Sequence, residues 1–220
     1  MKKLEDILKG KTCAVVSNSG SLLENEYGSL IDSHDVILRV NRCIIKGFET
    51  YVGSKTDIRL LNIHCSNSIF DNSYQKDYFN KRYSTWSTNN ITSVIEDEIL
   101  ILRYSPHVSI VNKIIDNEIY SKEKFIAHVC LNGNLELTAG GDAILIATSL
   151  FEKVSCFCFD LFSNISEKEV KTSSNFSLPA RVPSKKIHYF EDVFWNRSLA
   201  HNYKEEKKYL KKISNIEWFD

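Results

Sequence analysis

The 220-residue chain has few prolines and glycines, three and eight respectively, and it contains no long hydrophobic run. No segment approaches the roughly 18 apolar residues of a membrane span, and the charged start of the chain lacks a signal-peptide core. Lys and Arg together number 28, as do Asp and Glu, so no net charge attracts nucleic acid. These absences favour a cytoplasmic protein that binds no nucleic acid and whose membrane contact is at most peripheral, at the inner membrane.

The sequence also lacks the usual signatures of phosphate loops and metal sites. It contains no GxxxxGK[ST], GxGxxG or HExxH motif and no Asp-x-Asp pair. Its six cysteines lie mostly in apolar runs, as buried thiols do in a reducing compartment. We expect Cys156 and Cys158 to point to opposite faces of a strand and so not to share a metal. No metal or other cofactor is therefore expected.

Apolar runs alternate with helical patterns along the chain. The expected strands are 12–17, 35–40, 57–63, 98–103, 125–129 and 154–159, and the expected helices are 2–9, 20–30, 74–82, 109–119, 142–151 and the tail 185–220. Strands separated by helices favour a parallel sheet that is covered on both faces. We predict one α/β domain over residues 1–220, Rossmann-like, with a twisted, mostly parallel sheet flanked by helices.

Polar residues follow the expected strands where ligands bind in open α/β sheets. Asn18 and Asn41 follow the first two strands, and Phe159-Asp160 follows the last. An asparagine offers both a donor and an acceptor, which suits a nucleotide, although it can equally cap its own turn. The turn Thr138–Gly141 precedes a helix, whose N-terminal N–H groups suit a phosphate or a carboxylate. Together these residues predict an anion or nucleotide site.

Two histidines near the C-terminal end are candidates for chemistry. His188 and His201 lie 13 residues apart, and a histidine can act as a general base or donate to a phosphate. The alternative is that both are surface or helix-capping residues. We interpret the other four histidines, His34 among them, as structural. The acidic cluster Glu96–Glu98 is expected in a solvated turn, and Lys204–Lys212 on a solvated helix face.

Seven short segments in the first part of the chain closely resemble the long sialylmotif of the eukaryotic-type sialyltransferases, glycosyltransferase family 29. They are Cys13-Ala-Val-Val16, Asn18-Ser-Gly20, Tyr27-Gly28, Ile31-Asp-Ser-His-Asp35, Arg39-Val-Asn41, Lys46-Gly-Phe-Glu49 and Val52-Gly-Ser-Lys-Thr56. Three further motifs follow in the family's order: Leu137–Phe159 resembles the short sialylmotif, His188-Tyr-Phe-Glu191 motif III, and His201 with Glu206 the very short motif. The resemblance covers nearly the whole chain except 64–130, and it suggests a soluble bacterial or viral member.

The resemblance implies an inverting, metal-independent glycosyltransferase on a GT-A-like variant of the Rossmann-type sheet. Such an enzyme moves sialic acid, or a related nonulosonic acid, from a CMP-activated donor to a glycan hydroxyl, for example in lipooligosaccharide or capsule. The CMP-sugar is then a co-substrate and no cofactor is needed. Residues 13–60 and 137–160 would form the donor site, and 185–220 would form the catalytic C-terminal segment.

The resemblance also implies roles for individual residues. The donor would be bound by Asn18, Ser19, Asn41, Thr138, Ala139, Gly140, Phe159 and Asp160. His201 would take the proton of the acceptor hydroxyl, and His188 would assist the leaving CMP phosphate. Tyr189 and Glu206 would support these two histidines.

Three departures from the family pattern leave alternatives open. Phe151 stands where the family has a cysteine, so the usual disulfide with the residue matching Cys13 cannot form. The family's Ser-Thr-Gly turn is Thr138-Ala-Gly140, and its two glycines beside the phenylalanine are Cys158 and Asp160. The sugar acid therefore stays open: a CMP-Kdo-type transferase and a catalytically silent CMP-binding protein are the alternatives, and a hydrolase of the CMP donor is a third.

Overall fold

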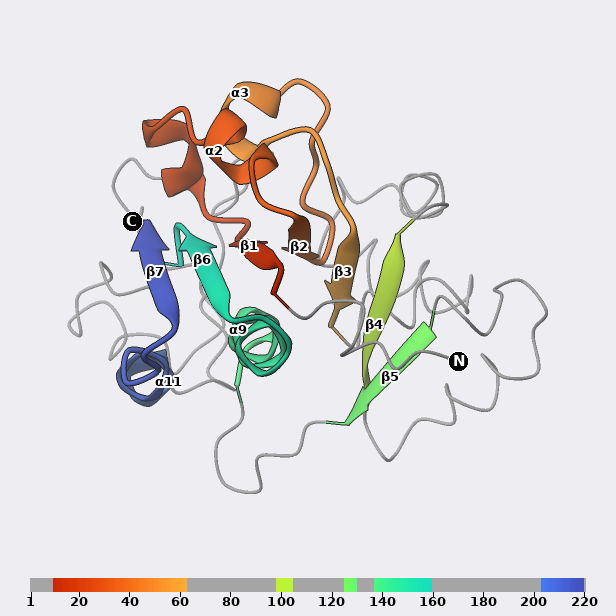
Figure 1. Cartoon of the computed structure of the whole chain (residues 1–220), viewed down its shortest axis with the longest axis vertical. Helices are drawn as coiled ribbons and strands as arrows, with labels where there is room; N and C mark the ends of the chain where they lie inside the picture. The colour runs from red at the N-terminus through yellow and green to blue at the C-terminus, as the bar shows by residue number, and fades with distance from the viewer. Residues whose placement is uncertain (1–9, 63–97, 105–124, 130–136, 160–202, 220) are drawn as a thin grey trace, which may run out of the picture.

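A parallel sheet forms the centre of the protein. The computed structural model describes residues 10–62, 98–104, 125–129, 137–159 and 203–219. Its strands are β1 (Thr12–Val16), β2 (Val36–Val40), β3 (Ile58–Leu61), β4 (Ile99–Tyr104), β5 (Phe125–Val129), β6 (Lys153–Phe157) and β7 (Ile216–Phe219). They form one seven-stranded sheet in the order β5-β4-β3-β2-β1-β6-β7, in which all neighbouring strands are parallel (Figure 1). The predicted parallel α/β architecture is confirmed.

Helices cover both faces of this sheet. They are the 3-10 helix η1 (Gly20–Glu24) and the α-helices α2 (Gly28–Asp32), α3 (Glu49–Val52), α9 (Ala139–Leu150) and α11 (Tyr203–Leu210). Figure 1 shows α2 and α3 on one side of the strands and α9 and α11 on the other. None of the helices that the structure describes is long and apolar enough to cross a membrane.

Two sequence expectations about these elements were wrong. Residues 20–30 form two short helices rather than one, because η1 ends at Glu24 and α2 begins only at Gly28. A Cβ on Gly28 would collide with backbone oxygens of Glu49 and Thr50, so this glycine permits the close approach of α2 to α3. Residues 216–219, in the tail expected to be helical, form the edge strand β7.

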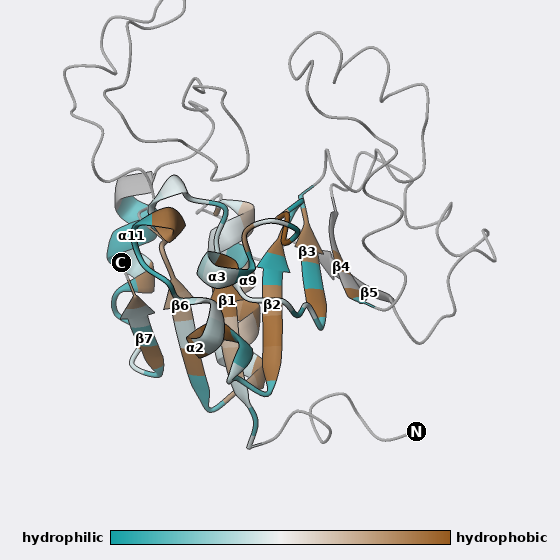
Figure 2. Ribbon diagram, turned by 90° about the horizontal axis from the view of Figure 1, so that it is seen from above, coloured by the Kyte–Doolittle hydropathy of each residue, from teal (hydrophilic) through white to brown (hydrophobic). Residues whose placement is uncertain are grey.

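The strands alternate their side chains between two apolar clusters. Cys13 and Val15 of β1 pack with Ala143 and Ile144 of α9, while Ala14 and Val16 face the opposite cluster. Each central strand is therefore buried on both sides, as is usual for a parallel sheet covered by helices. Figure 2 shows the apolar strands interrupted by a hydrophilic band in β2 and another in β3. The charged residues of these two strands are Arg39 and Arg59, and both are buried.

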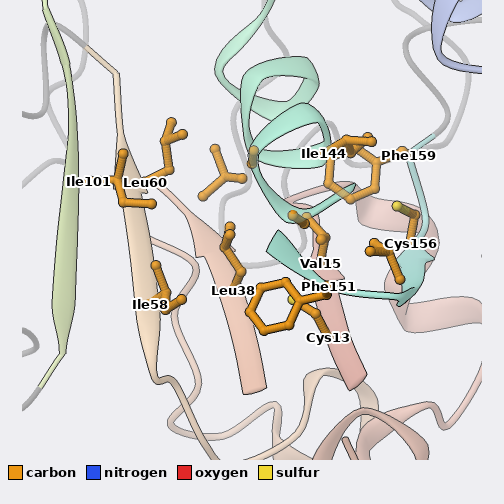
Figure 3. Packing of buried hydrophobic residues seen from close by; sticks show 14 of the residues in the cluster. Cys13, Val15, Leu38, Ile58, Leu60, Ile101, Ile144, Phe151, Cys156 and Phe159 are labelled. Atoms are coloured by element: carbon orange, nitrogen blue, oxygen red, sulfur yellow. The ribbon is translucent and has the colours of Figure 1, made fainter. Parts of the chain in front are cut away.

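The four described cysteines are buried free thiols, whereas Cys65 and Cys130 lie outside the described residues. Burial raises the pKa of both Cys13 and Cys156 well above the usual thiol value. Phe151, which stands in place of the family's cysteine, packs in the same cluster as Cys13, and Figure 3 shows its ring beside that residue. An aromatic ring thus fills core space at the position where a disulfide partner would stand.

Cys156 and Cys158 point into different clusters, as expected, but for a reason that the sequence analysis did not identify. Residues two apart in a regular strand share a face. The chain leaves β6 after Phe157, and Cys158 adopts a left-handed conformation with φ of 54°. The family pattern has a glycine at this position, and glycine adopts a positive φ more easily than cysteine does.

Candidate nucleotide-binding site

The candidate site lies where the sheet reverses its order of winding. From β1 the chain continues to β2 on one side, while β6 and β7 pair on the other side. Ligands of open α/β sheets bind at the carboxyl ends of strands at such a point. Ser17 joins the strand ends here, because its N–H donates to the carbonyl of Phe157 at 3.3 Å and its Oγ donates to that of Cys158 at 2.7 Å.

Asn18 lies at the end of β1 and is half-buried. Its Nδ2 donates to the carbonyl of Val40, the last residue of β2, at 2.9 Å. Its Oδ1 is buried and has no hydrogen-bond partner within the part of the chain that the structure describes. A buried polar atom without a partner is uncommon in a folded protein. Asn18 therefore presents a hydrogen-bond acceptor at the carboxyl edge of the sheet.

Asn41, at the end of β2, is oriented in the opposite sense. Its Oδ1 accepts from the N–H of Asn62 at 2.8 Å, and its own N–H donates to the carbonyl of Leu60 at 2.7 Å. The alternative raised from the sequence, in which the asparagine caps its own turn, is not what this oxygen does, because it binds the segment after β3, 21 positions away. The nitrogen Nδ2 is the atom of this amide left to bind a ligand, so Asn41 offers a donor at the end of β2 and Asn18 an acceptor at the end of β1.

α9 begins at Ala139, three residues before the expected helix start at 142, so Ala139–Gly141 form its first turn instead of a turn that precedes it. Thr138 is the N-cap, and its Oγ1 accepts from the N–H of Gly141 at 3.0 Å. The N–H groups of Ala139 and Gly140 lie in the first turn, where an α-helix provides no internal partner. Ala139 is 8% exposed, so a ligand would meet its backbone rather than its side chain.

Phe159 and Gly140 contact one another across this edge. A Cβ added to Gly140 would lie 2.9 Å from Cε1 of Phe159, so only glycine lets the ring pack against the first turn of α9. Phe159 is 5% exposed and belongs to the core cluster with Ile144 (Figure 3). It thus supports the site from within the core. Two predicted site residues that are 19 positions apart in the sequence are brought together.

Glu206 of α11 binds the same turn. Its carboxylate is fully buried and accepts from the N–H of Thr138 at 2.9 Å and from the Oγ1 of Thr138 at 2.6 Å. A Cβ on Gly141 would collide with Oε1 of Glu206. The predicted supporting residue therefore joins α11 to the N-terminus of α9 and places a negative charge where the helix dipole favours one.

Ser19, the remaining described candidate, has a local role. Its Oγ accepts from the N–H of Ser21 at 3.2 Å and so caps η1. The predicted residues Asp160, His188, Tyr189 and His201 lie outside the described residues.

A buried ion pair that was not predicted from the sequence lies near the end of β2. Glu98, expected in a solvated turn, is only 6% exposed and pairs with Arg59 of β3. Arg59 also donates to the carbonyls of Asn41 and Arg42. An arginine inside the apolar run Ile58–Leu61 was the available signal, since a buried cation needs a partner.

His34 is structural as expected, because its ring nitrogens contact the Leu30 carbonyl and Ser155 Oγ. Within the described ranges, no group of three or more His, Cys, Asp or Glu side chains is arranged to hold a metal ion.

Comparison with known proteins adds to this geometry. The family Glycosyltransferase family 29 (sialyltransferase) matches residues 3–217. A "Beta-1,6-galactosyltransferase GALT29A" of Arabidopsis thaliana is 51% identical over 51 residues, which cover 23% of this chain and 13% of the relative. The human "CMP-N-acetylneuraminate-beta-galactosamide-alpha-2,3-sialyltransferase 1" is 47% identical over 62 residues, which cover 28% of this chain and 18% of the relative. The matched segments are thus a small part of these relatives.

A solved structure shares the fold over most of the chain. The "Crystal Structure of a Mammalian Sialyltransferase in complex with Gal-beta-1-3GalNAc-ortho-nitrophenol" superposes with a TM-score of 0.55 at 20% identity. The superposition covers 95% of this chain and 69% of that one. At this identity the likeness shows the fold alone.

Proposed function

The chain belongs to glycosyltransferase family 29, the sialyltransferases, and from this premise we propose that it is an inverting, metal-independent glycosyltransferase. It moves sialic acid, or a related nonulosonic acid, from a CMP-activated donor to a hydroxyl of a glycan, such as lipooligosaccharide or capsule. The observation that supports the proposal most directly is the buried Oδ1 of Asn18, an acceptor without a partner among the described residues. It lies at the switch point of a doubly wound sheet, where nucleotides bind.

The two asparagines would contact the donor with different atoms. Asn18 Oδ1 would accept from a ribose hydroxyl or the cytosine amino group, and Asn41 Nδ2 would donate to an acceptor atom of the nucleotide. The N–H groups of Ala139 and Gly140 would face the negative charge of the donor. Ser19, Thr138, Phe159 and Asp160 would complete the pocket, within a single GT-A-like catalytic domain.

His201 is proposed as the general base. The acceptor hydroxyl gives its proton to His201, and its oxygen attacks the anomeric carbon on the face opposite to CMP. The bond between that carbon and the phosphate oxygen breaks, its electron pair stays on CMP, and the configuration inverts. His188 donates to the leaving phosphate, with Tyr189 in support. One positioned base and a few hydrogen-bond donors are sufficient for this reaction.

The position of α11 supports a catalytic role for the C-terminal segment. Glu206 holds α11 against Thr138 at the donor edge. In the sequence, His201 precedes the first residue of α11 by two positions. The helix that follows the proposed base is therefore the one that contacts the proposed donor site.

The family alone leaves the donor sugar open. The Arabidopsis relative is named a galactosyltransferase, and the short-motif departures at Ala139, Cys158 and Asp160 leave a CMP-Kdo-type donor as an alternative. A panel of CMP-sialic acid, CMP-Kdo and UDP-galactose, each with and without glycan acceptors, discriminates these options by mass spectrometry. We expect acceptor-dependent release of CMP from a CMP-sugar acid. Release without an acceptor would indicate a hydrolase, and no release from any donor would leave only a CMP-binding protein.

The base is tested by His201→Ala. Because a general base contributes about 10²–10⁴-fold to the rate, this variant is expected to keep CMP binding and lose most of its turnover. His188→Ala is expected to slow CMP departure in single-turnover measurements. His34→Ala, at a structural histidine, is the control and should lower stability while the folded protein keeps its turnover. A near-native kcat in His201→Ala would show that another group is the base.

A further inference from the structure

Arg59 is a buried cation within an apolar strand. Its neighbours in β3 are Ile58, Leu60 and Leu61, and its side chain is 1% exposed. A guanidinium removed from water is strongly unfavourable unless both its charge and its N–H groups are matched. The groups that match Arg59 therefore indicate what the residue does.

Glu98 matches the charge. Nε of Arg59 lies 2.5 Å from Oε2 of Glu98, and Nη2 lies 2.8 Å from Oε1. These are the two parallel contacts of a bidentate pair, the strongest geometry available to these side chains. Glu98 is itself buried and immediately precedes β4. The pair thus joins β3 to the start of β4 and leaves little net charge to attract a phosphate.

The remaining terminal nitrogen of Arg59 holds the loop after β2. Nη1 donates to the carbonyl of Asn41 at 2.6 Å and to that of Arg42 at 2.7 Å. In this nucleotide loop (residues 41–43), Asn41 has a φ of 56° and Cys43 a φ of 32°. Such conformations are uncommon for residues other than glycine, and they persist where surrounding contacts impose them. Arg59 supplies two of those contacts.

A neighbouring buried arginine makes different backbone contacts from those of Arg59. Arg39 is its register partner in β2 and is equally buried. Its guanidinium donates instead to the carbonyls of Val52 and Lys55, in the segment before β3. Arg39 also reaches the loop, because its Nη1 donates to Sγ of Cys43 at 3.6 Å. Arg59 differs in that it bonds to backbone carbonyls of the loop, one of them that of the proposed nucleotide contact Asn41.

We propose that Arg59 and Glu98 are positioning residues that hold the nucleotide loop so that Nδ2 of Asn41 faces the donor. This inference rests on the proposed function, since it takes Asn41 as a donor contact. Arg59 acts through the backbone of the loop and does not bind the phosphate, because Glu98 neutralises its charge and two carbonyls occupy Nη1. Loss of these two carbonyl contacts should weaken CMP binding even in a protein that remains fully folded.

Two variants separate loop positioning from stability. In the double variant Arg59→Met/Glu98→Leu, apolar side chains of similar volume replace the pair, an exchange that is often neutral or stabilising. We expect a melting temperature within a few degrees of the unmodified protein but a CMP Kd raised about tenfold, the equivalent of one hydrogen bond to a charged group. Glu98→Gln leaves a buried cation without its counter-charge. It should lower the melting temperature by about 6 °C or more, yet keep the CMP Kd within about threefold, because Nη1 still binds the loop.

Calorimetric titration with CMP gives the Kd values, and amide hydrogen exchange of the peptide containing residues 41–43 follows the loop in ligand-free protein. We expect faster exchange there in the double variant only. Asp35→Ala, which removes the acceptor of two hydrogen bonds from Thr12 at the amino end of the sheet, is the control for general destabilisation. It should leave both readouts unchanged.

The outcomes are decisive in each case. A stable double variant with native CMP affinity and native loop exchange overturns the inference. If the unmodified protein does not bind CMP, the proposed function fails, and loop exchange alone then decides whether the pair holds the loop. If the double variant does not fold, Arg59→Lys replaces it. A lysine cannot reach Glu98 and both carbonyls together, so native CMP affinity in that variant would equally contradict the proposal.

Discussion

At the scale of single residues, Asn18 and Asn41 occupy equivalent strand ends but expose different atoms. The side-chain nitrogen of Asn18 donates to the Val40 carbonyl, and its oxygen has no partner among the described residues. In Asn41 the side-chain oxygen accepts from the N–H of Asn62 instead. One side chain is left as an acceptor and the other as a donor. A pair of opposite polarity suits a nucleotide, which carries both kinds of group.

Asn18→Ala tests this assignment. The substitution removes the acceptor at the switch point, and we expect the CMP Kd to rise about tenfold, in line with the loss of one well-placed hydrogen bond. Isothermal titration calorimetry measures the change. Asn25→Ala is the control, because Asn25 is exposed and its backbone carbonyl accepts from the N–H of Tyr27. We expect the CMP affinity of this variant to be unchanged. Equal affinity in the two variants would remove Asn18 from the site.

At the scale of elements, one contact joins the helix after the proposed base to the helix at the donor edge. Glu206 of α11 accepts two hydrogen bonds from Thr138, the N-cap of α9, and Gly141 leaves room for its carboxylate. In the sequence, α11 follows α9 only after β6 and residues 158–202. The turn of α9 that is proposed to bind the donor and the position of α11 are therefore linked through one carboxylate.

Glu206→Gln probes this link. The N–H and the Oγ1 of Thr138 each donate to one carboxylate oxygen of Glu206. In the variant an NH2 group replaces one of these two acceptors, so one hydrogen bond is lost. We expect the free energy of unfolding to fall by about 2 kcal/mol and CMP binding to weaken. Chemical denaturation and calorimetry measure the two effects. Glu205→Gln is the matched control, because that side chain is half-exposed and lies 4.0 Å from Lys208. A surface pair of this kind contributes less than about 0.5 kcal/mol. Similar losses in both variants would contradict the link.

At the scale of the whole molecule, the sheet divides into two halves that meet at β1. β2 to β5 extend on one side and β6 and β7 on the other, with the helices on opposite faces (Figure 1). The long-motif segment supplies β1, β2 and most of β3, and the short-motif segment supplies α9 and β6. The candidate site exists only where the halves meet, because Ser17 and Asn18 bond to both.

Metal dependence is a property of the whole proposed reaction. Because a base and hydrogen-bond donors suffice in the proposed mechanism, we expect turnover to be unchanged within about twofold after EDTA treatment, whereas a metal-assisted reaction depends on its ion. A coupled CMP-release assay with and without EDTA, followed by Mg²⁺ or Mn²⁺ addition, measures this. Activity that EDTA abolishes and a metal restores would show that the reaction follows a different route.

The expectation of a parallel α/β sheet held because it depends on short-range patterns. Apolar runs of about five residues, separated by helical periodicity, indicate buried parallel strands wherever they occur. The strand ends at Val16, Val40 and Phe157 consequently predicted which side chains would gather at one edge. The broken helix at residues 20–32 and the strand β7 were missed, because tertiary packing overrides weak local preferences.

The amino-acid sequence by itself determined the family and the parallel sheet, and it predicted which side chains follow the strand ends, since motif spacing and strand ends are local properties. Only the tertiary structure decided which atom of each asparagine faces that edge, that Glu98 is buried, and that Glu206 binds Thr138. Those facts depend on partners 39 and 68 residues apart for the two carboxylates. A buried charge is matched by whatever side chain the completed fold brings to it, and no local pattern specifies that partner.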